Sequence, residues 1–413
     1  MPHGRPGVWV SEALSRPLPT LVEVFGLRRN IVVLSLAIFG VGLGEELWVR
    51  FLPTYLEALG ASVLVIGAFG TLQDLLEGLY PYPGGVLADR WGRKRALVTC
   101  NALALVGYGL YLVSPSWPFV FVGLAFTMAW SSLALPATFA VIAESLPPDR
   151  RAMGFTVQSV LKRLPIVLAP PLGGLLIGYV GLVAGVRAGL AVTLVLGVLS
   201  LLAQHWFYTE APPAARPAPI SLTHTLRTLP TALKRLLLAE SIVRSGQGLA
   251  EIFVVLYVTQ VVGLSAATFG TLVALRMATS ILAYLPAATL ADRHGRTPLV
   301  LASFLCYALF PFLLVSTQGP VGLVAAFIYA GLREIGEPAR KAMIVDLAED
   351  ARRGQIVGVY YLTRGLVVMP ASLIGGLLWT LTPQAPFVVA AGVCLLGVVL
   401  MAIGQRSGRA SAG

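Results

Sequence analysis

Long apolar segments alternate with short polar breaks along the whole chain, and this pattern is the strongest structural signal in the sequence. A helix needs about 20 apolar residues to cross a hydrocarbon core of about 30 Å. We predict twelve such spans, at residues 31–56, 64–88, 95–113, 118–143, 153–178, 182–206, 235–259, 266–290, 298–316, 320–346, 355–380 and 386–404. Because their apolar residues are continuous, we expect helices and not the alternating strands of a membrane barrel. The predicted fold class is therefore an all-α integral membrane protein.

The composition agrees with lipid as the solvent of these spans. Hydrophobic residues make up 57% of the chain and charged residues 12%, whereas about a quarter of a soluble domain is charged. The first thirty residues lack a short apolar core with a small-residue cleavage site, so we expect the first span to stay in the protein. Cys100, Cys306 and Cys394 lie in or beside spans and offer neither a disulfide framework nor metal-ligand spacing.

The net charge of +11 is concentrated on alternate connections between spans. The loaded connections carry Arg90, Arg93, Lys94, Arg95, Arg150, Arg151, Arg216, Arg227, Lys234, Arg235, Arg293, Arg296, Arg352 and Arg353. The other connections, such as ALGAS and STQGP, carry no charged residue. By the positive-inside rule the loaded side is cytoplasmic, and both termini lie there. We interpret the basic excess as a topology signal of a multi-pass inner-membrane protein, not as a nucleic-acid site.

The chain repeats itself at a shift of about two hundred residues. FGTL at 69 recurs at 269, LADRxGR at 87 recurs at 290, and GGLL at 173 recurs at 375. The matches keep their order, which indicates a six-helix unit duplicated in the same orientation. A Pro/Ala-rich stretch between the halves reads as a linker. The predicted organisation is a tail at 1–30, a bundle at 31–206, a linker at 207–234, a bundle at 235–404 and a tail at 405–413.

The charged turn GVLADRWGRK at 85–94 contains the pattern G-x-L-A-D-R-x-G-R-[KR], and the chain thereby resembles the major facilitator superfamily. The second copy departs from the pattern at Ala288 and Thr297. The resemblance covers the whole chain, because span count, linker and duplication all agree with it. It implies two six-helix bundles that rock about a site near the bilayer midplane.

In that family the charged turn belongs to a latch that stabilises one of the two access states. The alternative is that the turn only anchors helix ends in water and headgroups. A reversal within about six residues needs glycine, and the acid is well placed near a helix N-terminus or an arginine. The candidate latch residues are Gly85, Asp89, Arg90, Gly92, Arg93, Asp292, Arg293, Gly295 and Arg296.

Ionisable residues also stand in the middle of several spans, where a charge costs roughly 2.5–3.5 kcal/mol, so we expect them to face a wet cavity or each other. The candidates for proton coupling or the substrate cavity are Glu45, Glu46, Arg50, Asp74, Glu77, Arg163, Glu251, Arg276, Arg333, Glu334, Glu337 and Arg364, with Lys162 and Arg244 at similar depth. Residues four apart share a helix face, which predicts the pairs Glu46–Arg50, Glu240–Arg244, Arg333–Glu337 and Glu337–Lys341.

An acid that exchanges protons must differ from a merely paired one, because it has to change its protonation with the access state. Glu45, Asp74, Glu77 and Glu251 have no basic partner four residues away, so we prefer them as coupling residues. The alternative is that paired charges only join helices or close a gate.

Span 5 contains APPLGG, which resembles the G-P-x-x-G-G pattern of proton-coupled exporters in this superfamily. Pro170, Gly173 and Gly174 match the pattern, and Ala169 replaces its first glycine. Proline and small residues permit a bend and tight helix contact that restricts leakage between the bundles. We therefore expect a helix-bend motif here. Exporters of that kind also tend to carry an arginine in span 4, and this span has none; Arg333 stands in its duplicated counterpart, span 10.

The sequence thus predicts a proton-coupled exporter of a small amphipathic organic compound, with an uptake symporter for a charged, possibly anionic, solute as the alternative. We expect a small-molecule substrate, protons or sodium, and the lipid bilayer as partners, no nucleic acid, and a monomer. No midspan histidine and no phosphate-binding loop are present, so we expect neither an enzyme nor an ATP-driven pump, and no cofactor or metal. A sensor that does not transport would add a long soluble domain, which the sequence lacks.

Overall fold

The computed structural model describes residues 29–134, 137–138, 141, 151–209, 226–227, 229–317, 319–347 and 353–410. All regular elements in these ranges are helices. The first half contains α3 (Arg29–Glu46), η1 (Val49–Phe51), α4 (Leu52–Ala58), α5 (Val63–Leu79), α6 (Pro81–Trp91), α7 (Arg93–Val113), α8 (Trp117–Met128), η2 (Ala129–Leu133), α10 (Arg151–Val180) and α11 (Leu182–Phe207).

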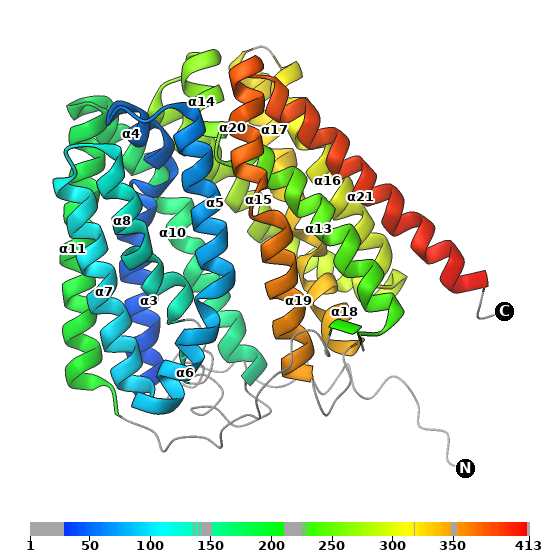
Figure 1. Ribbon diagram of the computed structural model, residues 1–413, viewed down its shortest axis with the longest axis horizontal. Coiled ribbons are helices and arrows are strands. Elements are labelled where there is room, and N and C mark those ends of the chain that lie inside the picture. The colour runs from blue at the N-terminus through cyan, green and yellow to red at the C-terminus, as the bar shows by residue number, and fades with distance from the viewer. Residues whose placement is uncertain are drawn as a thin grey trace, which may run out of the picture.

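The second half repeats this plan with α13 (Thr231–Glu251), α14 (Val254–Leu256), η4 (Tyr257–Val261), α15 (Ala266–His294), α16 (Arg296–Ser316), α17 (Pro320–Leu332), η5 (Arg333–Gly336), α18 (Glu337–Asp346), α19 (Arg353–Val368), α20 (Ala371–Leu381) and α21 (Ala385–Ala410). The two halves form two helix bundles that lie side by side (Figure 1).

Ten helical stretches of the described residues are long and apolar enough to cross a membrane. These ten correspond to predicted spans other than the fourth and the tenth. In the fourth, the described helix Trp117–Leu133 is shorter, and the predicted span continues beyond the described residues. In the tenth, η5 interrupts the helix between α17 and α18, and the charged residues Arg333 and Glu334 stand in this interruption in the middle of the span. The all-α membrane fold is therefore confirmed.

Several spans are discontinuous. In the second span α5 ends at Leu79 and α6 begins at Pro81, because proline lacks the amide hydrogen that would continue the helix. The first span breaks after Glu46 and the seventh after Glu251, with no proline within the break itself. Charged residues therefore stand next to irregular backbone in the interior of the molecule.

The two charged turns have the same backbone geometry. Gly92 ends α6 and precedes α7 at φ +88°, and Gly295 ends α15 and precedes α16 at φ +85°. This left-handed conformation is open to glycine and strained for other residues. The repeated glycine thus lets the chain reverse direction once in each half, at the end of the molecule that carries α6. This is the lower end in Figure 1.

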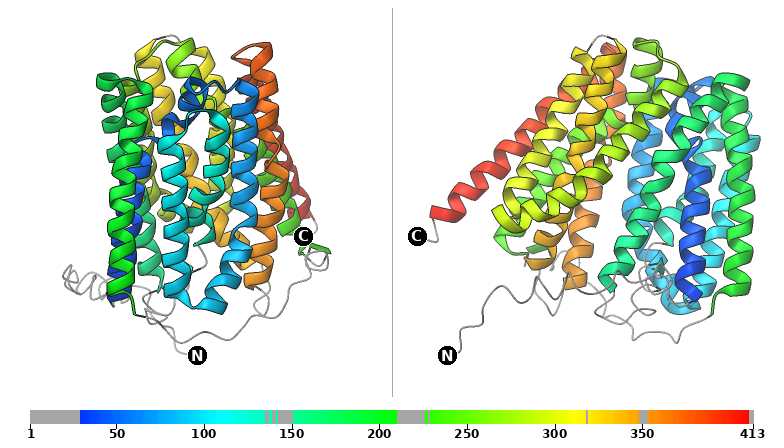
Figure 2. Two further views of the ribbon diagram at one scale, coloured as in Figure 1. Left: turned by 60° about the vertical axis from the view of Figure 1, so that its left-hand side comes forward. Right: turned by 180° about the vertical axis from the view of Figure 1, so that it is seen from behind.

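The bundles meet along two helix pairs, α5 with α20 and α10 with α15 (Figure 2, right, shows the second pair from behind). A Cβ on Gly174 of α10 would overlap the carbonyl oxygen of Ala266, and one on Gly270 of α15 would overlap that of Pro170. A Cβ on Gly67 of α5 would lie 2.7 Å from the carbonyl oxygen of Ser372. The backbones of the two halves are therefore in contact toward the upper end, where α4 and α14 lie.

Aromatic packing closes the same end. The rings of Phe51 and Phe269, one from each half, lie 5.7 Å apart in a T-shaped arrangement, and both are buried. One large apolar cluster includes these residues and spans both halves, whereas a second cluster lies within the second half alone. The apolar core of the molecule is thus continuous between the bundles near the upper end.

Candidate functional site

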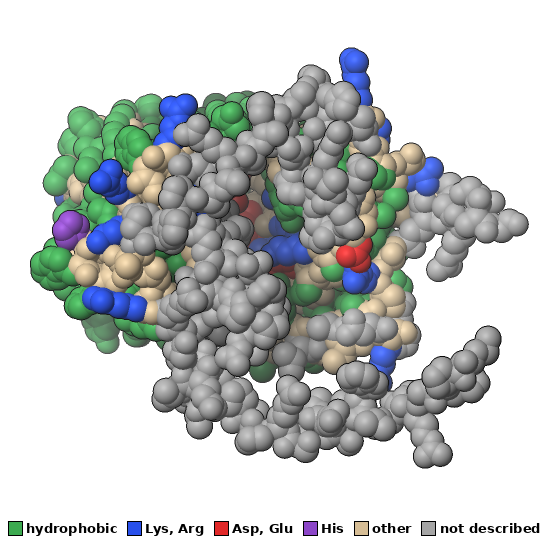
Figure 3. Space-filling view, turned by 90° about the horizontal axis from the view of Figure 1, so that it is seen from below, with side chains coloured by type: hydrophobic (Ala, Val, Ile, Leu, Met, Phe, Trp, Pro, Cys, Tyr) green, Lys and Arg blue, Asp and Glu red, His purple; other side chains and the backbone are tan. Residues whose placement is uncertain are grey.

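The midspan charges of the two halves converge between the bundles. Seen from the lower end, basic and acidic side chains appear in a recess between the halves, with many apolar side chains around the outer edge (Figure 3). Glu77 and Lys162 are exposed although they stand in spanning helices, and most of the other predicted cavity residues are half-buried. Charged side chains exposed within spanning helices require water, because the hydrocarbon of a bilayer does not solvate them.

Glu251, the last residue of α13, receives two arginines from other helices. Arg333 of η5 donates from Nη1 to Oε2 at 2.9 Å and from Nη2 to Oε1 at 3.1 Å, so its fork binds both carboxylate oxygens. Arg276 of α15 donates from Nη1 to Oε1 at 2.9 Å. We call Glu251, Arg276 and Arg333 the central triad.

The arginines of the central triad are more enclosed than its carboxylate. The side chain of Glu251 is 33% exposed, against 10% for Arg276 and 7% for Arg333. The guanidinium carbon of Arg333 lies 5.2 Å from the ring centre of Tyr307, and its Nε lies 3.6 Å from Glu334. Aromatic faces attract guanidinium groups, so this packing holds the arginine in place.

Across from the central triad, the first half contributes an ion pair at the break of its own first span. Arg50 donates from Nε and Nη2 to the two oxygens of Glu46, each at 2.7 Å. Arg50 also lies close enough to Glu251 and Arg333 for their charges to act on it. Broken helices of the two halves therefore present their charges to each other.

A second contact joins the halves through Arg163 of α10. This arginine donates to Glu337 at 3.1 Å, to the hydroxyl of Tyr284 at 3.1 Å and to that of Ser280 at 3.0 Å. Lys341 adds an ion pair of 2.6 Å to Glu337. Glu337 is thus shared between a base of the first half and a base of the second.

Two other acids of the first half, Glu45 and Asp74, have weaker partners. The hydroxyl of Tyr108 donates to Glu45, and that of Ser372 donates to Asp74 across the bundle interface at 3.4 Å. The charge of Lys162 acts on Glu45 and on Glu77 without a direct contact in either case. A carboxylate whose direct partners are neutral hydroxyl groups can take up a proton without breaking an ion pair.

One further cluster lies inside the second half. The carboxylate of Glu240 is completely buried and binds Arg364 at 2.8 Å and Arg340 at 3.2 Å, with Arg244 at 4.0 Å. The hydroxyl of Tyr360 donates to it at 2.5 Å. Arg364, a predicted cavity residue, therefore belongs to this cluster.

The candidate latch residues lie away from the central triad, at the lower end. Arg93 is buried and donates to the carbonyl oxygen of Ala88, 3.0 Å away, which closes the end of α6. Arg296 binds Asp346 at the end of α18. The side chains of Asp89 and Asp292 lie outside the described residues, so their predicted latch role stays a prediction.

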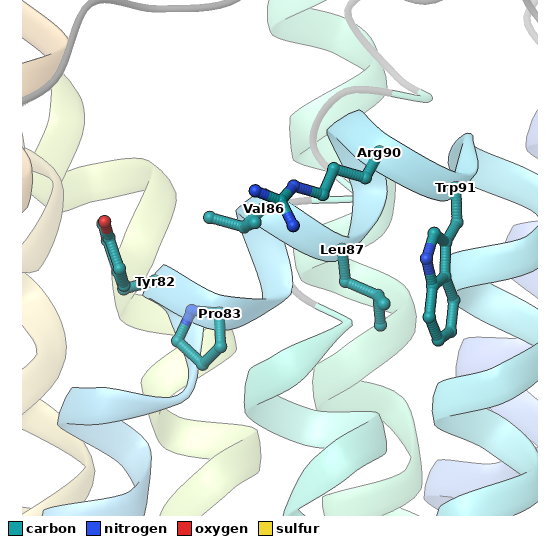
Figure 4. A pocket seen from close by; sticks show the side chains of 6 residues that line it. All are labelled: Tyr82, Pro83, Val86, Leu87, Arg90 and Trp91. Carbon is teal, nitrogen blue, oxygen red and sulfur yellow. The ribbon is translucent and has the colours of Figure 1, made fainter.

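Arg90 and Arg293 line two related surface grooves. Arg90 lies over a groove of about 300 Å³ beside Tyr82, Val86, Leu87 and Trp91, while Gly85 stands within the same helix, α6 (Figure 4). Arg293 lines its counterpart on α15. Neither groove includes a residue of the central triad.

The helix-bend motif lies where α10 touches both halves. Pro170 stands inside the continuous helix α10, and its carbonyl oxygen faces Gly270 of the other half. A Cβ on Gly173 would overlap the carbonyl oxygen of Leu47, next to the break of the first span. Gly173 therefore packs within its own bundle, while Gly174 packs against the other.

Three of the four predicted helical pairs are present, at 2.7 Å for Glu46–Arg50, 2.6 Å for Glu337–Lys341 and 4.0 Å for Glu240–Arg244. The pair Arg333–Glu337 was expected wrongly. The tighter turns of η5 rotate Arg333 away from Glu337, and Arg333 binds Glu251 instead. The sequence reasoning also missed the tyrosines that bind the carboxylates, namely Tyr108, Tyr284, Tyr307 and Tyr360, because nothing distinguishes them from packing tyrosines.

Comparison with known proteins places this geometry in a family. The model of the Major Facilitator Superfamily matches residues 34–246 and 236–411. An uncharacterized MFS-type transporter of Methanocaldococcus jannaschii is 22% identical over 390 residues, which cover 91% of this chain and 94% of that one. An enterobactin exporter of Shigella flexneri is 27% identical, with 95% of this chain and 93% of that one covered. The quinolone resistance protein NorA of Staphylococcus aureus is 29% identical over 36% of this chain and 38% of its own.

Solved structures share the fold. A POT family transporter in complex with 5-aminolevulinic acid superposes with a TM-score of 0.76 at 15% identity, covering 92% of this chain and 96% of that chain. The nucleoside transporter NupG superposes with a TM-score of 0.72 at 14% identity, covering 91% and 99%.

Proposed function

Because this chain belongs to the major facilitator superfamily, we propose that it is a secondary active transporter that exports a small amphipathic organic compound in exchange for protons. Alternating access is the mechanism that two duplicated bundles suit best, since rocking of one against the other exposes a site between them to each side in turn. The bilayer, one small solute and protons are its proposed partners, and a single chain is the proposed working unit.

The observation that carries this proposal is the contrast between the two ends of the bundle interface. Glycine backbones and the ring pair Phe51–Phe269 close the upper end, while charged side chains face a recess toward the lower end. A transporter in a conformation that is closed at one end and open at the other has this asymmetry. The basic turns at Gly92 and Gly295 lie at the lower end, so we assign that end, and both termini, to the cytoplasm of an inner membrane.

Glu45 is our first choice for the coupling proton. Its direct partner is the neutral hydroxyl of Tyr108, whereas Glu251 is held by two arginines and would leave them uncompensated when protonated. Asp74 and Glu77 follow, since the direct contact of Asp74 is to a hydroxyl group and Glu77 is exposed. One proton that moves through 100 mV contributes about 2.3 kcal/mol, which suffices for a solute gradient of nearly fiftyfold.

Export is supported by the relatives. The enterobactin exporter matches nearly the full length of the chain, and the quinolone resistance protein matches a shorter part of it. Uptake of an anionic solute with protons is the second candidate, and the arginines Arg50, Arg163, Arg276 and Arg333 near the interface favour it.

The test is transport by the purified chain in proteoliposomes under imposed pH or sodium gradients, with a panel of amphipathic compounds. We expect a pH gradient, and not a sodium gradient, to drive transport from the side of the basic turns to the other. Glu45→Gln should abolish the response to the pH gradient, with Asp74→Asn, Glu77→Gln and Glu251→Gln compared under the same conditions. Full gradient-driven transport by all four variants would refute the assignment of the coupling acids, and accumulation in the opposite direction would favour the uptake symporter.

A further inference from the structure

The central triad has the form of an anion site that is filled by the protein's own carboxylate. Two guanidinium groups from different helices, α15 and η5, point at one pair of oxygen atoms. The fork of Arg333 binds both oxygens in parallel, which is the geometry that guanidinium groups adopt with any carboxylate. Such a site recognises a carboxylate, whether it belongs to a side chain of the protein or to a bound small molecule.

The carboxylate is the member of the triad that is free to leave. Arg333 is enclosed and packs against the rings of Tyr307 and Phe310, at 5.2 and 5.9 Å, so its position is fixed without Glu251. Glu251 is the most exposed of the three, and it ends α13 just before irregular backbone at residues 252 and 253. A small backbone rotation there moves the carboxylate while both arginines stay in place.

A released Glu251 does not lose all electrostatic support. Arg50 of the opposite half already lies within reach of its charge, and Arg50 is held by Glu46 at the equivalent break of the first span. The negative charge can therefore move from the arginines of one half toward the arginine of the other. This exchange avoids the large cost of an unpaired charge in the interior.

We propose that Arg276 and Arg333 form the subsite for an acidic group of the transported compound, that Glu251 occupies this subsite in its absence, and that the compound is an amphipathic organic acid. This inference rests on the proposed function, since it names the chemical class that the transporter carries. A cationic amphipathic compound is disfavoured, because it cannot replace Glu251 as the partner of the two enclosed guanidinium groups. Its positive charge would also be repelled by them.

The first test compares three probes with the same apolar body, 2-naphthoate, 2-naphthamide and 2-naphthylmethylammonium, for binding to the purified full chain in detergent micelles. Micelles without protein correct for partitioning. We expect 2-naphthoate to bind at least about tenfold more tightly than the other two, because only its carboxylate accepts charge-assisted hydrogen bonds from both arginines. Equal or tighter binding of the amide or the ammonium probe would overturn the inference on the wild-type chain alone.

The second test uses changes of opposite expected sign. Arg276→Gln and Arg333→Gln should each weaken binding of 2-naphthoate about tenfold or more, whereas Glu251→Gln should tighten it several-fold because the internal competitor is gone. Glu337→Gln is the control, since it makes the same change at another partly buried carboxylate that binds Arg163 and Lys341 instead of the triad, and it should not tighten binding. If the triad is only a structural bridge, Glu251→Gln weakens binding together with the arginine variants. If Arg333→Gln does not fold, the binding of 2-naphthoate to Arg276→Gln decides between the two interpretations, because this variant removes only one hydrogen bond to Glu251.

The two proposals fail separately. Gradient-driven transport of the ammonium compound without the acid would sink this inference and leave the proposed transporter intact. Absence of gradient-driven transport for every compound, with 2-naphthoate bound as expected, would sink the proposed function and leave an anion site.

Discussion

At the scale of single residues, Glu240 of α13 is the acid around which the buried cluster of the second half is built. Its completely buried carboxylate is the common partner of Arg340, Arg364 and Arg244. Arg340 is itself only 3% exposed, so water cannot replace the carboxylate as its counter-charge. Removal of one member of a buried ion pair leaves an uncompensated charge, which costs more than the intact pair contributes.

Glu240→Gln should therefore lower the free energy of unfolding by about 3–5 kcal/mol, although the amide keeps the size of the side chain. Glu77→Gln makes the same chemical change at an exposed carboxylate of α5 and should change stability by about 0.5 kcal/mol or less. The measurement is the thermal unfolding of both variants in the same detergent. Similar melting temperatures for the two would show that the buried cluster does not stabilise the bundle.

The charge pairs also mark the limit of sequence reasoning at this scale. Helix geometry alone predicts Glu46–Arg50 and Glu337–Lys341, because residues four apart share a face whatever the tertiary structure. The contact between Arg163 and Glu337 depends on which faces of α10 and α18 meet, and nothing local in the sequence specifies that. The sequence therefore identified most of the interior charged residues but not the groups that they form.

At the scale of helices, length and apolarity predict where spans lie but not where they break. Pro81 stands at the break between α5 and α6, where it cannot supply the amide hydrogen that would continue the helix. η5 is followed by Pro338, which has no amide hydrogen to bond to the carbonyl oxygen of Glu334. The break after Glu251 contains no proline, so there the packing of neighbouring helices determines the backbone. Neither break was predicted, and together they bring Arg333 and Glu251 into contact.

The close approach of α10 and α15 gives a prediction at this scale. Gly174→Ala places a methyl group against the carbonyl oxygen of Ala266, and overpacking of this kind costs about 1–3 kcal/mol. This overlap destabilises the conformation in which the upper end is closed, so we expect that conformation to lose population. The transport rate in proteoliposomes should therefore fall about fivefold or more. Gly178→Ala lies one turn further along α10 with no atom within 4 Å, and it should transport normally. Equal transport rates for the two variants would show that α10 and α15 can accommodate a methyl group at Gly174 without loss of function.

At the scale of the whole molecule, the duplicated plan supports the proposal that the halves move as units. Each half keeps its own ion pairs, Glu46–Arg50 in one and Glu240–Arg364 in the other, and these contacts remain when the halves separate. Glycine contacts near the upper end and the bond from Arg163 to Glu337 join the halves and have to change. The sequence predicted the two bundles from their repeats, whereas the closed upper end depends on which conformation the packing favours.

A pair of matched disulfides tests whether transport requires the halves to separate. A Cβ on Gly70 would lie 2.8 Å from the Cβ of Ser372 across the halves, and one on Gly44 would lie 3.1 Å from the Cβ of Thr193 within the first half. Both distances are shorter than the spacing of about 3.5–4.5 Å that a disulfide needs, so the two backbones of each pair have to part by up to about 1 Å when the bond forms. The native cysteines Cys100, Cys306 and Cys394 are buried and can stay in place.

Oxidation of Gly70→Cys/Ser372→Cys should stop transport, because the upper end can no longer open, and reduction should restore it. Gly44→Cys/Thr193→Cys should transport equally well when oxidised and when reduced, since its bridge stays inside one moving unit. The measurement is gradient-driven uptake into proteoliposomes before and after a reductant, with cross-linking followed by loss of free thiols. Undiminished transport by the fully oxidised Gly70/Ser372 pair would mean that the two halves do not part at the upper end, and that rocking of the bundles is not how this protein moves its solute.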